Sequence, residues 1–403
     1  MDKKPEKLVP EVRFKGFTDD WEQHKLGETL TGFEYGLNTP ATDYDGINKY
    51  LRITDIDDVS HKFDISHLTS PKLKDDNYLL ANGDILFART GASVGKSYRY
   101  SNIDGKVYYA GFLIKAHIKD HFSTNFIFDT TLLPRYHYFV QVTSMRSGQP
   151  GINAKEYQKY IIYTPSESEQ NKISDLILTI QKLIDLQQRK LEQLKLLEKA
   201  HQQKLFPNSF QEKPLLRILH GDNSWWNSYI GEVFTERVDK GSSEKLLSVS
   251  ITDGVYPFDE SKRKNNSSDD KHNYKKVFQN DIAYNSMRLW QGALGVSKYE
   301  GIVSPAYTVL KPLPNQNSIF YEFMFKNIDM LHIFQRNSQG LTSDTWNLKF
   351  NQLQHIKIKT TNLNSQNKIA KLLIKIEELK NNESNYYHNL MTLKKYLLQK
   401  LFL

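Results

Sequence analysis

Two long segments of the chain carry apolar residues at the spacing of an α-helix. Between residues 166 and 206 there is no glycine or proline, and Pro207 ends the segment. Residues 362–403 also lack both residue types. At a rise of about 1.5 Å per residue, each segment predicts one helix about 50–55 Å long. The apolar positions at helical spacing are Ile173, Ile177, Ile180, Ile184, Leu191 and Leu194 in the first segment and Ile369, Leu373, Ile376, Leu390 and Leu397 in the second.

These stripes predict that the two helices pair with each other as an antiparallel coiled coil, with mixed charges on their outer faces. The alternative is that each helix packs only on its own domain. A helix of about 50 Å is longer than a domain of about 150 residues requires, which favours pairing.

The remaining segments, residues 21–165 and 225–361, follow a different pattern. Short aromatic and β-branched runs such as Val107-Tyr108-Tyr109 and Ile302-Val303 predict strands, and Asn82-Gly83-Asp84 predicts a turn. Together with the helices, they predict an α+β fold with two pseudo-repeated α/β globules, each followed by a long helix. The predicted globular domains are residues 1–165 and 207–361, and the predicted helical segments are residues 166–206 and 362–403.

The sequence contains an internal repeat. Gln170-Asn171-Lys172-Ile173 recurs as Gln366-Asn367-Lys368-Ile369, and Gln203-Lys204-Leu205-Phe206 recurs as Gln399-Lys400-Leu401-Phe402. The starts of the two units also correspond, since Trp21, Gly27 and Glu28 match Trp225, Gly231 and Glu232. Each unit thus has a similar frame and a divergent interior, which predicts a pseudo-two-fold architecture.

Composition narrows the class of protein. The 403 residues are 39% hydrophobic and 25% charged, which is enough apolar material for folded cores. The absence of cysteine excludes disulfide frameworks, thiol catalysis and cysteine-ligated zinc, and it fits a reducing compartment. No apolar run approaches the length of a transmembrane helix. We therefore expect a cytoplasmic protein with no membrane partner.

The net charge of +8 permits a polyanion partner but does not identify one. Half of the excess lies on residues 362–403, which hold 7 basic and 3 acidic residues. The first 165 residues are balanced, with 21 of each sign. If the first unit binds nucleic acid, its charges must therefore be segregated onto one face.

No catalytic constellation stands out. The run from Gly91 to Ser97 resembles a phosphate-binding loop, but Thr90 occupies the position that requires glycine, so a turn between strands is the better interpretation. Asp55, Asp57 and Asp58 suggest a metal cluster, but a solvated turn after the strand at Leu51-Arg52-Ile53 is the better interpretation. The 12 histidines form no ligand set, and the Asn/Asp-Pro-Pro-Tyr signature of an amino-methyltransferase does not occur. We therefore predict a chain that is no enzyme and binds no metal or cofactor.

Polar, basic and aromatic residues gather near glycine turns in both units. Arginine matches guanine in a bidentate way, Asn and Gln match adenine, and Ser, Thr and Lys contact bases or phosphates. Ordinary surface polarity accounts for any one of these residues, but their recurrence at corresponding places favours DNA binding for the set. The candidate DNA-binding residues are Arg89, Thr90, Ser93, Lys96, Arg146 and Gln149 in the first unit and Lys262, Arg263, Lys264, Asn285, Ser286, Arg288, Trp290, Gln291, Arg336 and Gln339 in the second.

With these features the chain resembles the DNA specificity subunits of type I restriction-modification systems, over essentially its whole length. The motifs that carry the resemblance are Trp21-x4-Leu26-Gly27-Glu28, Gly83-Asp84-Ile85-Leu86 with Arg89 and Gly91, and Gln170-x-x-Ile173 in the first half, and Tyr284-Asn285-Ser286-Met287-Arg288, Trp290-Gln291-Gly292-Ala293 and Ser304-Pro305-Ala306-Tyr307 in the second. Each motif is moderately specific, and their ordered duplication is strongly specific.

The resemblance implies two target-recognition domains, each reading one half of a split double-stranded DNA target. It implies that the paired helices set the spacing of the domains and dock two methyltransferase subunits, which in turn recruit two restriction and translocation subunits. The chain then directs adenine methylation and restriction, while S-adenosylmethionine, ATP and magnesium are expected on the partner subunits.

Three alternatives stay open from the residues alone. The chain could be a stand-alone, repressor-like DNA-binding protein with two DNA-reading modules. It could be a complete methyltransferase–specificity fusion, against which the missing catalytic motifs and the short length count. It could also be a structural scaffold with two lectin-like or enzyme-inhibitor modules.

Overall fold

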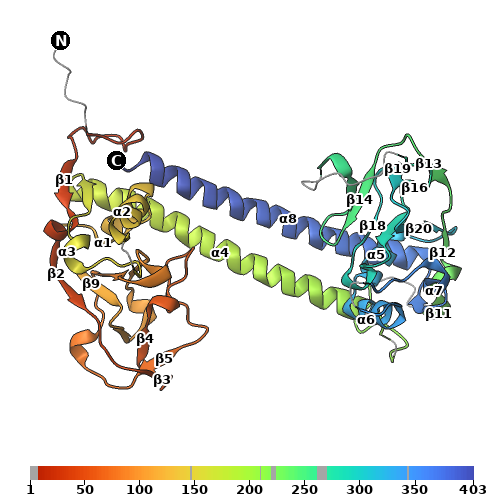
Figure 1. The fold of residues 1–403 in the computed structure, drawn as a ribbon, viewed down its shortest axis with the longest axis horizontal. Coiled ribbons are helices and arrows are strands. Elements are labelled where there is room, and N and C mark those ends of the chain that lie inside the picture. Colours follow the sequence, from red (N-terminus) through yellow and green to blue (C-terminus); the bar gives the residue numbers. More distant parts are fainter. Residues whose placement is uncertain (1–7, 146–147, 209, 219–223, 261–269, 343–344) are drawn as a thin grey trace, which may run out of the picture. The chain divides into compact units, whose positions relative to one another are not determined.

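The computed structural model describes residues 8–145, 148–208, 210–218, 224–260, 270–342 and 345–403. The chain divides into two compact units. The first comprises residues 1–187 and 386–403, and the second comprises residues 188–385. This division cuts across both long helices, so each unit holds one globule together with part of each helix (Figure 1).

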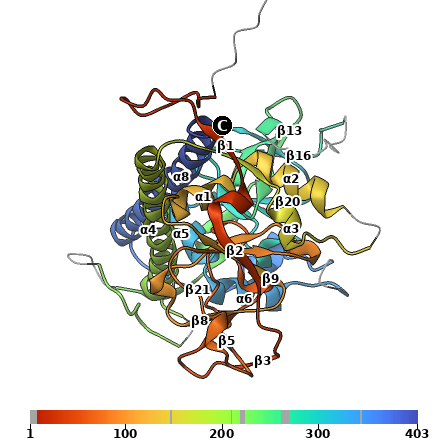
Figure 2. The same ribbon diagram turned by 90° about the vertical axis from the view of Figure 1, so that its left-hand side faces the viewer.

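The globule of the first unit is built on a four-stranded antiparallel sheet with the strand order β2-β9-β6-β7. Figure 2 faces this unit and shows α1, α2 and α3 beside β2 and β9. Its strands are β1 (Glu22–Lys25), β2 (Leu30–Tyr35), β3 (Ala41–Asp43), β4 (Lys49–Leu51), β5 (Thr69–Pro71), β6 (Asp84–Ala88), β7 (Ser97–Arg99), β8 (Val107–Tyr109), β9 (Leu113–Ile118) and β10 (Ile161–Thr164). Its helices are α1 (Thr124–Thr130), α2 (Pro134–Ser144) and α3 (Ala154–Tyr157), and the long α4 (Glu167–Leu205) begins in this unit.

Both faces of this sheet are covered, which is why β6 is buried along its whole length. Alternate side chains of a strand point to opposite faces. Ile85 and Phe87 pack into the core that contains α1, α2 and the start of α4, whereas Leu86 and Ala88 pack into a second core with Val107 and its neighbours. The globule therefore has a helical layer, a central sheet and a layer of short strands.

The second unit repeats this plan. Its central sheet has the strand order β12-β20-β17-β18, which matches that of the first unit strand for strand. Its strands are β11 (Trp226–Tyr229), β12 (Phe234–Glu236), β13 (Lys240–Gly241), β14 (Leu247–Ser250), β15 (Gly254–Pro257), β16 (Tyr274–Val277), β17 (Ile282–Asn285), β18 (Leu294–Val296), β19 (Gly301–Val303), β20 (Tyr307–Pro312) and β21 (Lys357–Thr360). Its helices are α5 (Ser318–Phe325), α6 (Ile328–Asn337) and α7 (Phe350–Leu353), and the long α8 (Leu363–Lys400) begins here. The repeat and the strands expected around Val107 and Ile302 are thereby confirmed.

The repeated glycine near the start of each unit has a packing role. Gly27 donates its backbone N–H to Gln158 O at 3.1 Å, and Gly231 donates to Gln354 O at 3.0 Å. A Cβ on either glycine would lie 3.0 Å from the Cβ of that glutamine. A larger residue would therefore require the glutamine to shift by a few tenths of an ångström, beside the antiparallel pair that β1 forms with β10 and β11 forms with β21.

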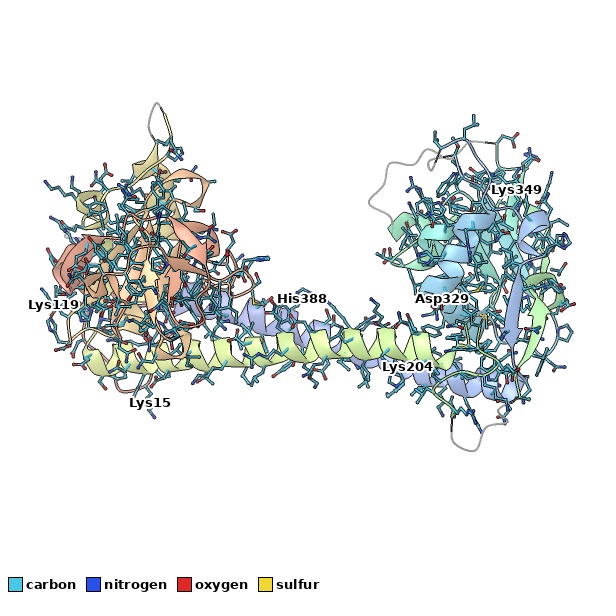
Figure 3. All side chains as sticks on the ribbon, turned by 90° about the horizontal axis from the view of Figure 1, so that it is seen from below. Lys15, Lys119, Lys204, Asp329, Lys349 and His388 are labelled. Atoms are coloured by element: carbon cyan, nitrogen blue, oxygen red, sulfur yellow. The ribbon has the colours of Figure 1, made fainter. Side chains whose placement is uncertain are left out.

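The predicted pairing of the long helices is confirmed within each unit. In the first unit, Ile180 and Ile184 of α4 form a cluster with Leu390 of α8, and Lys394 donates to Gln181 Oε1 at 2.7 Å. In the second unit, Lys190 binds Glu383 at 2.5 Å and Lys380 binds Glu198 at 2.7 Å, an order that makes the helices antiparallel. Figure 3 labels Lys204 of α4 and His388 of α8 along this pair.

The apolar stripe of each helix has two tasks. Ile173 and Ile177 belong to the core of the first globule, and Ile369 and Leu373 belong to that of the second. The first turns of each helix thus pack on the helix's own globule, which was the alternative to pairing, and the later turns pair. The other residues of the predicted stripes are buried at Ile180, Ile184, Ile376 and Leu390 and half-buried at Leu191, Leu194 and Leu397.

The last turn of each helix enters a globular core. Leu205 and Phe206 are buried at the end of α4 within the core of the second unit, and Phe206 lies 5.3 Å from Phe320, ring centre to ring centre. Leu401 and Phe402 occupy the same place in the first unit, where Phe402 stacks on Phe126 at 4.9 Å. The repeated Gln-Lys-Leu-Phe sequence is therefore the anchor that ends each helix.

One group of buried charges lies where α8 meets the first globule. Burial raises the pKa of Asp129, at the end of α1, to about 7, although Lys394 and Arg99 oppose the shift. Burial likewise lowers the pKa of Lys394, which Asp129 partly offsets. The carboxylate atom Oδ2 of Asp129 is buried without a hydrogen-bond partner in the described part of the chain. Ionisation of this carboxyl group therefore lowers the free energy of unfolding.

Candidate nucleic-acid interface

The loop that follows the central strand is fixed by the same backbone contacts in both units. Ala88 pairs with Leu113, as Asn285 pairs with Tyr307. Arg89 O accepts a hydrogen bond from Ile152 N at 2.9 Å, and Ser286 O accepts one from Leu348 N at 2.9 Å. Positions 89 and 286 are therefore equivalent. In each unit this hydrogen bond holds the loop that follows the central strand against the segment that precedes a short helix, α3 or α7.

In the first unit the loop presents Arg89. Its Nε donates to Gly111 O at 3.1 Å. The guanidinium carbon lies 5.1 Å from the centre of the Tyr35 ring and 5.7 Å from that of Phe112, which are cation–π distances. Both rings are partly exposed, Tyr35 to 45% and Phe112 to 55%. A half-buried arginine held between two accessible aromatic rings is a suitable group for contact with DNA.

The neighbouring predicted residues lie around this arginine. Gly91 N donates to Pro150 O at 3.0 Å, and the Thr90 hydroxyl reaches the same oxygen at 3.5 Å. Gly91 has a φ of +71°, and a Cβ there would lie 3.1 Å from Gln149 Nε2. The structure therefore brings Thr90 and Gln149 together, as the sequence suggested, and Ser93 follows on the same loop.

Lys96 has a different environment. Its Nζ lies 2.6 Å from Asp58 Oδ1 and 3.2 Å from Ile56 O, and only 19% of its side chain is exposed. A lysine that is already paired with a carboxylate gains less from a phosphate. The geometry thus gives Lys96 a structural contact within the first globule rather than a free charge.

In the second unit the equivalent loop carries Asn285, Ser286, Arg288, Trp290 and Gln291. Asn285 Oδ1 accepts from Met287 N at 3.0 Å, and the buried Ser286 donates to Ala306 O at 2.8 Å, so both side chains shape the loop. Arg288 is exposed, and its Nη1 lies 3.3 Å from Gln291 Oε1. Of these residues, Arg288 and Gln291 are thus the best placed for DNA.

Trp290 is held on the loop by its indole N–H, which donates to Met287 O at 3.2 Å. Its ring lies 5.3 Å from that of Trp346 in an edge-to-face arrangement. Gln339 joins this segment by a backbone pair with Asn347, with bonds of 3.0 and 2.8 Å. Arg336 is exposed in the last turn of α6. The structure thus places Gln339 beside the predicted loop and Arg336 on the preceding helix.

A hollow of about 390 Å³ lies beside this loop. Its polar border includes Lys349, labelled in Figure 3, together with Lys275 and Glu236. Asn347 also lines it, and the amide oxygen of Asn347 is buried without a hydrogen-bond partner in the described residues. Lys275 is paired with Glu236, whose Oε1 accepts from the lysine Nζ at 3.1 Å. The hollow therefore offers Lys349 and an amide oxygen that lacks a donor, a combination suited to a polar ligand edge.

Four predicted DNA-binding residues, Arg146, Lys262, Arg263 and Lys264, lie outside the described residues. The structure adds three aromatic residues to the candidate surface that were not predicted: Tyr35, Phe112 and Trp346. Nothing in their local sequence distinguishes them from core aromatics, because their relation to Arg89 and Trp290 depends on strand pairing over long separations. A ring flanked by glycine, as at Gly111-Phe112, is the weak signal that was available.

The weaker chemical motifs have structural roles. Gly91 to Ser93 form a short 3₁₀ turn between β6 and β7, in agreement with the turn interpretation. The three aspartates have separate partners, since Asp55 binds Arg52, Asp57 accepts from Ser60 and Asp58 binds Lys96. The residues that the structure describes contain no group of three or more side chains arranged to hold a metal ion. Nor do they form a helix with the length and apolar character needed to cross a membrane.

Comparison with known proteins agrees with the fold. Residues 19–196 match the family model described as type I restriction modification DNA specificity domain. No curated protein has a matching sequence. Among solved structures, the type I restriction-modification S subunit from M. genitalium is similar over 98% of this chain and 99% of its own, at 12% identity and a TM-score of 0.62. A structure described as the basis of assembly and conformational transition of the type I R-M system is similar over 99% of both chains, at 15% identity and a TM-score of 0.54.

Proposed function

We propose that the chain, of which residues 19–196 match the type I restriction modification DNA specificity domain, reads the DNA target of a type I restriction-modification complex. Each globule binds one half of a split double-stranded target. The polar loops at Arg89 and Arg288 contact the bases, and the chain directs adenine methylation and restriction that partner subunits carry out.

The observation that carries this proposal is the duplication of a rigid frame with unlike loops. The central sheets have the same strand order, and the loops are fastened by equivalent backbone bonds. The side chains that those loops present differ, with Arg89 and Thr90 in one unit and Ser286 and Met287 in the other. Equal frames with unlike contact residues are suited to reading two different half-sites.

The helix pair supplies a surface for the methyltransferase subunits. Ile173, Ile177, Ile180 and Ile184 are buried and so unavailable to a partner. A neighbouring row stays exposed and offers apolar contact area without unfolding any core. This row consists of Leu183, Leu197, Leu372, Leu379, Tyr386 and Leu393.

We assign S-adenosylmethionine to two methyltransferase subunits, and ATP and magnesium to two restriction subunits. The missing amino-methyltransferase signature supports this division, because the methylation chemistry then needs a second polypeptide. A type I complex-assembly structure is among those similar to this chain, which also favours a role within a complex.

Co-expression with a candidate methyltransferase subunit, followed by mapping of methylated adenines in host DNA, tests the proposal. We expect a split motif, with two specific parts separated by unread base pairs and methylation on both strands. The matched control is the methyltransferase subunit expressed without this chain, which should leave DNA unmodified. Tight sequence-specific binding by the chain alone, with no methylation in a well-formed complex, would instead favour the repressor-like alternative.

A further inference from the structure

The side chain of Arg89 is held in place before any DNA arrives. Its Nε donates a hydrogen bond to Gly111 O, and its guanidinium lies against the rings of Tyr35 and Phe112. Tyr35 is itself fixed, since its hydroxyl accepts from Ala154 N at 3.3 Å. A restrained arginine loses little rotamer freedom on binding, so its position and orientation can be specific for one ligand geometry.

The remaining donors of Arg89 have no partner among the residues that the structure describes. Hydrogen bonds there engage only its Nε, and none engages Nη1 or Nη2. Two parallel N–H groups on a planar fork match the O6 and N7 acceptors of guanine in the major groove. The same fork also fits two phosphate oxygens, but such a contact carries no sequence information, so base discrimination distinguishes the two ligands.

The second unit lacks this group at the equivalent position. Ser286 replaces Arg89 and Ala306 replaces Phe112, and the serine hydroxyl bonds to Ala306 O at 2.8 Å. Both small residues line the hollow described above. The space that an arginine and a phenylalanine occupy in the first unit is thus open in the second.

From these differences we propose that Arg89 reads one guanine in the half-site of the first unit, and that the second unit, with Ser286 at the equivalent place, lacks this bidentate contact. Tyr35 and Phe112 are positioning residues that orient the guanidinium. The proposal rests on the DNA-reading function proposed above and names the base that one of its residues selects.

The test uses the full chain in complex with a methyltransferase subunit and maps methylated motifs for Arg89→Ala, Arg89→Lys and the control Lys15→Ala. Lys15 is an exposed lysine of the first unit, labelled in Figure 3, and its substitution also removes one positive charge. We expect Arg89→Ala to lose discrimination at one G·C pair of one half-site by about tenfold to a hundredfold. Arg89→Lys should also relax that position, because an ammonium group lacks the bidentate fork.

A second measurement guards against misfolding of these variants. Thermal unfolding of each complex is compared with wild type, and Phe112→Ala is added because it keeps the arginine but removes one ring. Relaxation at the same base pair by Phe112→Ala, to a smaller extent, supports the positioning role. If a variant complex unfolds at a lower temperature than wild type, its base preference is measured instead by selecting bound duplexes from a random pool at low temperature.

Two results would overturn the inference. An unchanged motif with uniformly slower methylation at all sites would make Arg89 a phosphate contact. Full discrimination retained in Arg89→Ala would show that Arg89 does not read this base. Failure of the proposed function is a separate result, seen when the wild-type complex itself methylates no split motif, and that result removes the basis of this inference as well.

Discussion

At the residue scale, the two repeats keep the side chains that build the frame. Gln170 accepts from Ser123 N at 3.0 Å and donates to Pro165 O at 2.9 Å. Gln366 accepts from Asn317 N at 2.8 Å and donates to Thr361 O at 2.7 Å. Both amides are buried and join the start of a long helix, α4 or α8, to the start of an earlier helix of the same globule, α1 or α5. The first residue of the repeated Gln-Asn-Lys-Ile sequence therefore makes buried hydrogen bonds that join two helices. The amino-acid sequence alone does not show this role.

The exposed arginine of the second unit gives a prediction at this scale. Arg288→Ala should cost about 1–3 kcal/mol of DNA binding and relax specificity at one position if its guanidinium reads a base. Binding of duplex variants by the purified complex measures this cost. Lys298→Ala, at an exposed position of the same unit, is the control. An equal loss across all sequences would identify Arg288 as a phosphate contact.

The buried carboxyl group at Asp129 gives a prediction of pH dependence. Because its folded-state pKa is raised from 3.8 to about 7, the folded protein binds more protons than the unfolded chain between these values. The stabilisation by the protonated form is complete below about pH 4 and is lost as the pH rises through about 7. Relative to Asp129→Asn, wild type should therefore lose stability over this range, by a few kcal/mol at most.

Urea unfolding of both proteins at several pH values between about 4 and 7 measures this difference. The control is Asp43→Asn, which changes an exposed carboxylate on β3. A constant difference between wild type and Asp129→Asn across the range would show that Asp129 titrates normally in the folded protein.

At the scale of elements, the long helices were predictable and the sheet was not. Uninterrupted 3.6-residue periodicity predicts residues 166–206 and 362–403, and the structure has helices at Glu167–Leu205 and Leu363–Lys400. The central sheet joins Leu30–Tyr35 to Leu113–Ile118, and such distant pairing leaves no local pattern. The frame of the candidate surface follows from the repeat, whereas the meeting of Arg89 with Tyr35 and Phe112 depends on that pairing.

The anchors at the helix ends give a prediction at this scale. Phe402→Ala should destabilise the first unit by about 3–5 kcal/mol, because it removes a buried ring that packs on Phe126 and Trp21. Urea unfolding of the full chain measures the loss. Leu196→Ala, where the side chain is 68% exposed, should leave stability nearly unchanged. Equal behaviour of the two variants would contradict the anchoring role of the repeated Gln-Lys-Leu-Phe sequence.

At the scale of the whole molecule, we propose two DNA-reading domains whose spacing on DNA depends on the length of the paired helices. Adding four residues to the middle of α4 and four to the middle of α8 lengthens each helix by about 6 Å. Since base pairs are spaced about 3.4 Å apart, the unread spacer of the methylated motif should grow by one or two base pairs. The control is a four-residue insertion at the exposed turn beside Gly46. An unchanged spacer in the lengthened chain would contradict a measuring role of the helices.

The central claim is that each globule independently reads one half of the target. The most direct test is a chain in which the second globule, residues 225–361, is replaced by a copy of the first, residues 21–165, followed by methylation mapping with the same methyltransferase subunit. We expect a split motif in which both specific parts carry the bases of the first half-site. A motif that keeps the second half-site of the wild type, in a complex that still assembles, would contradict the central claim.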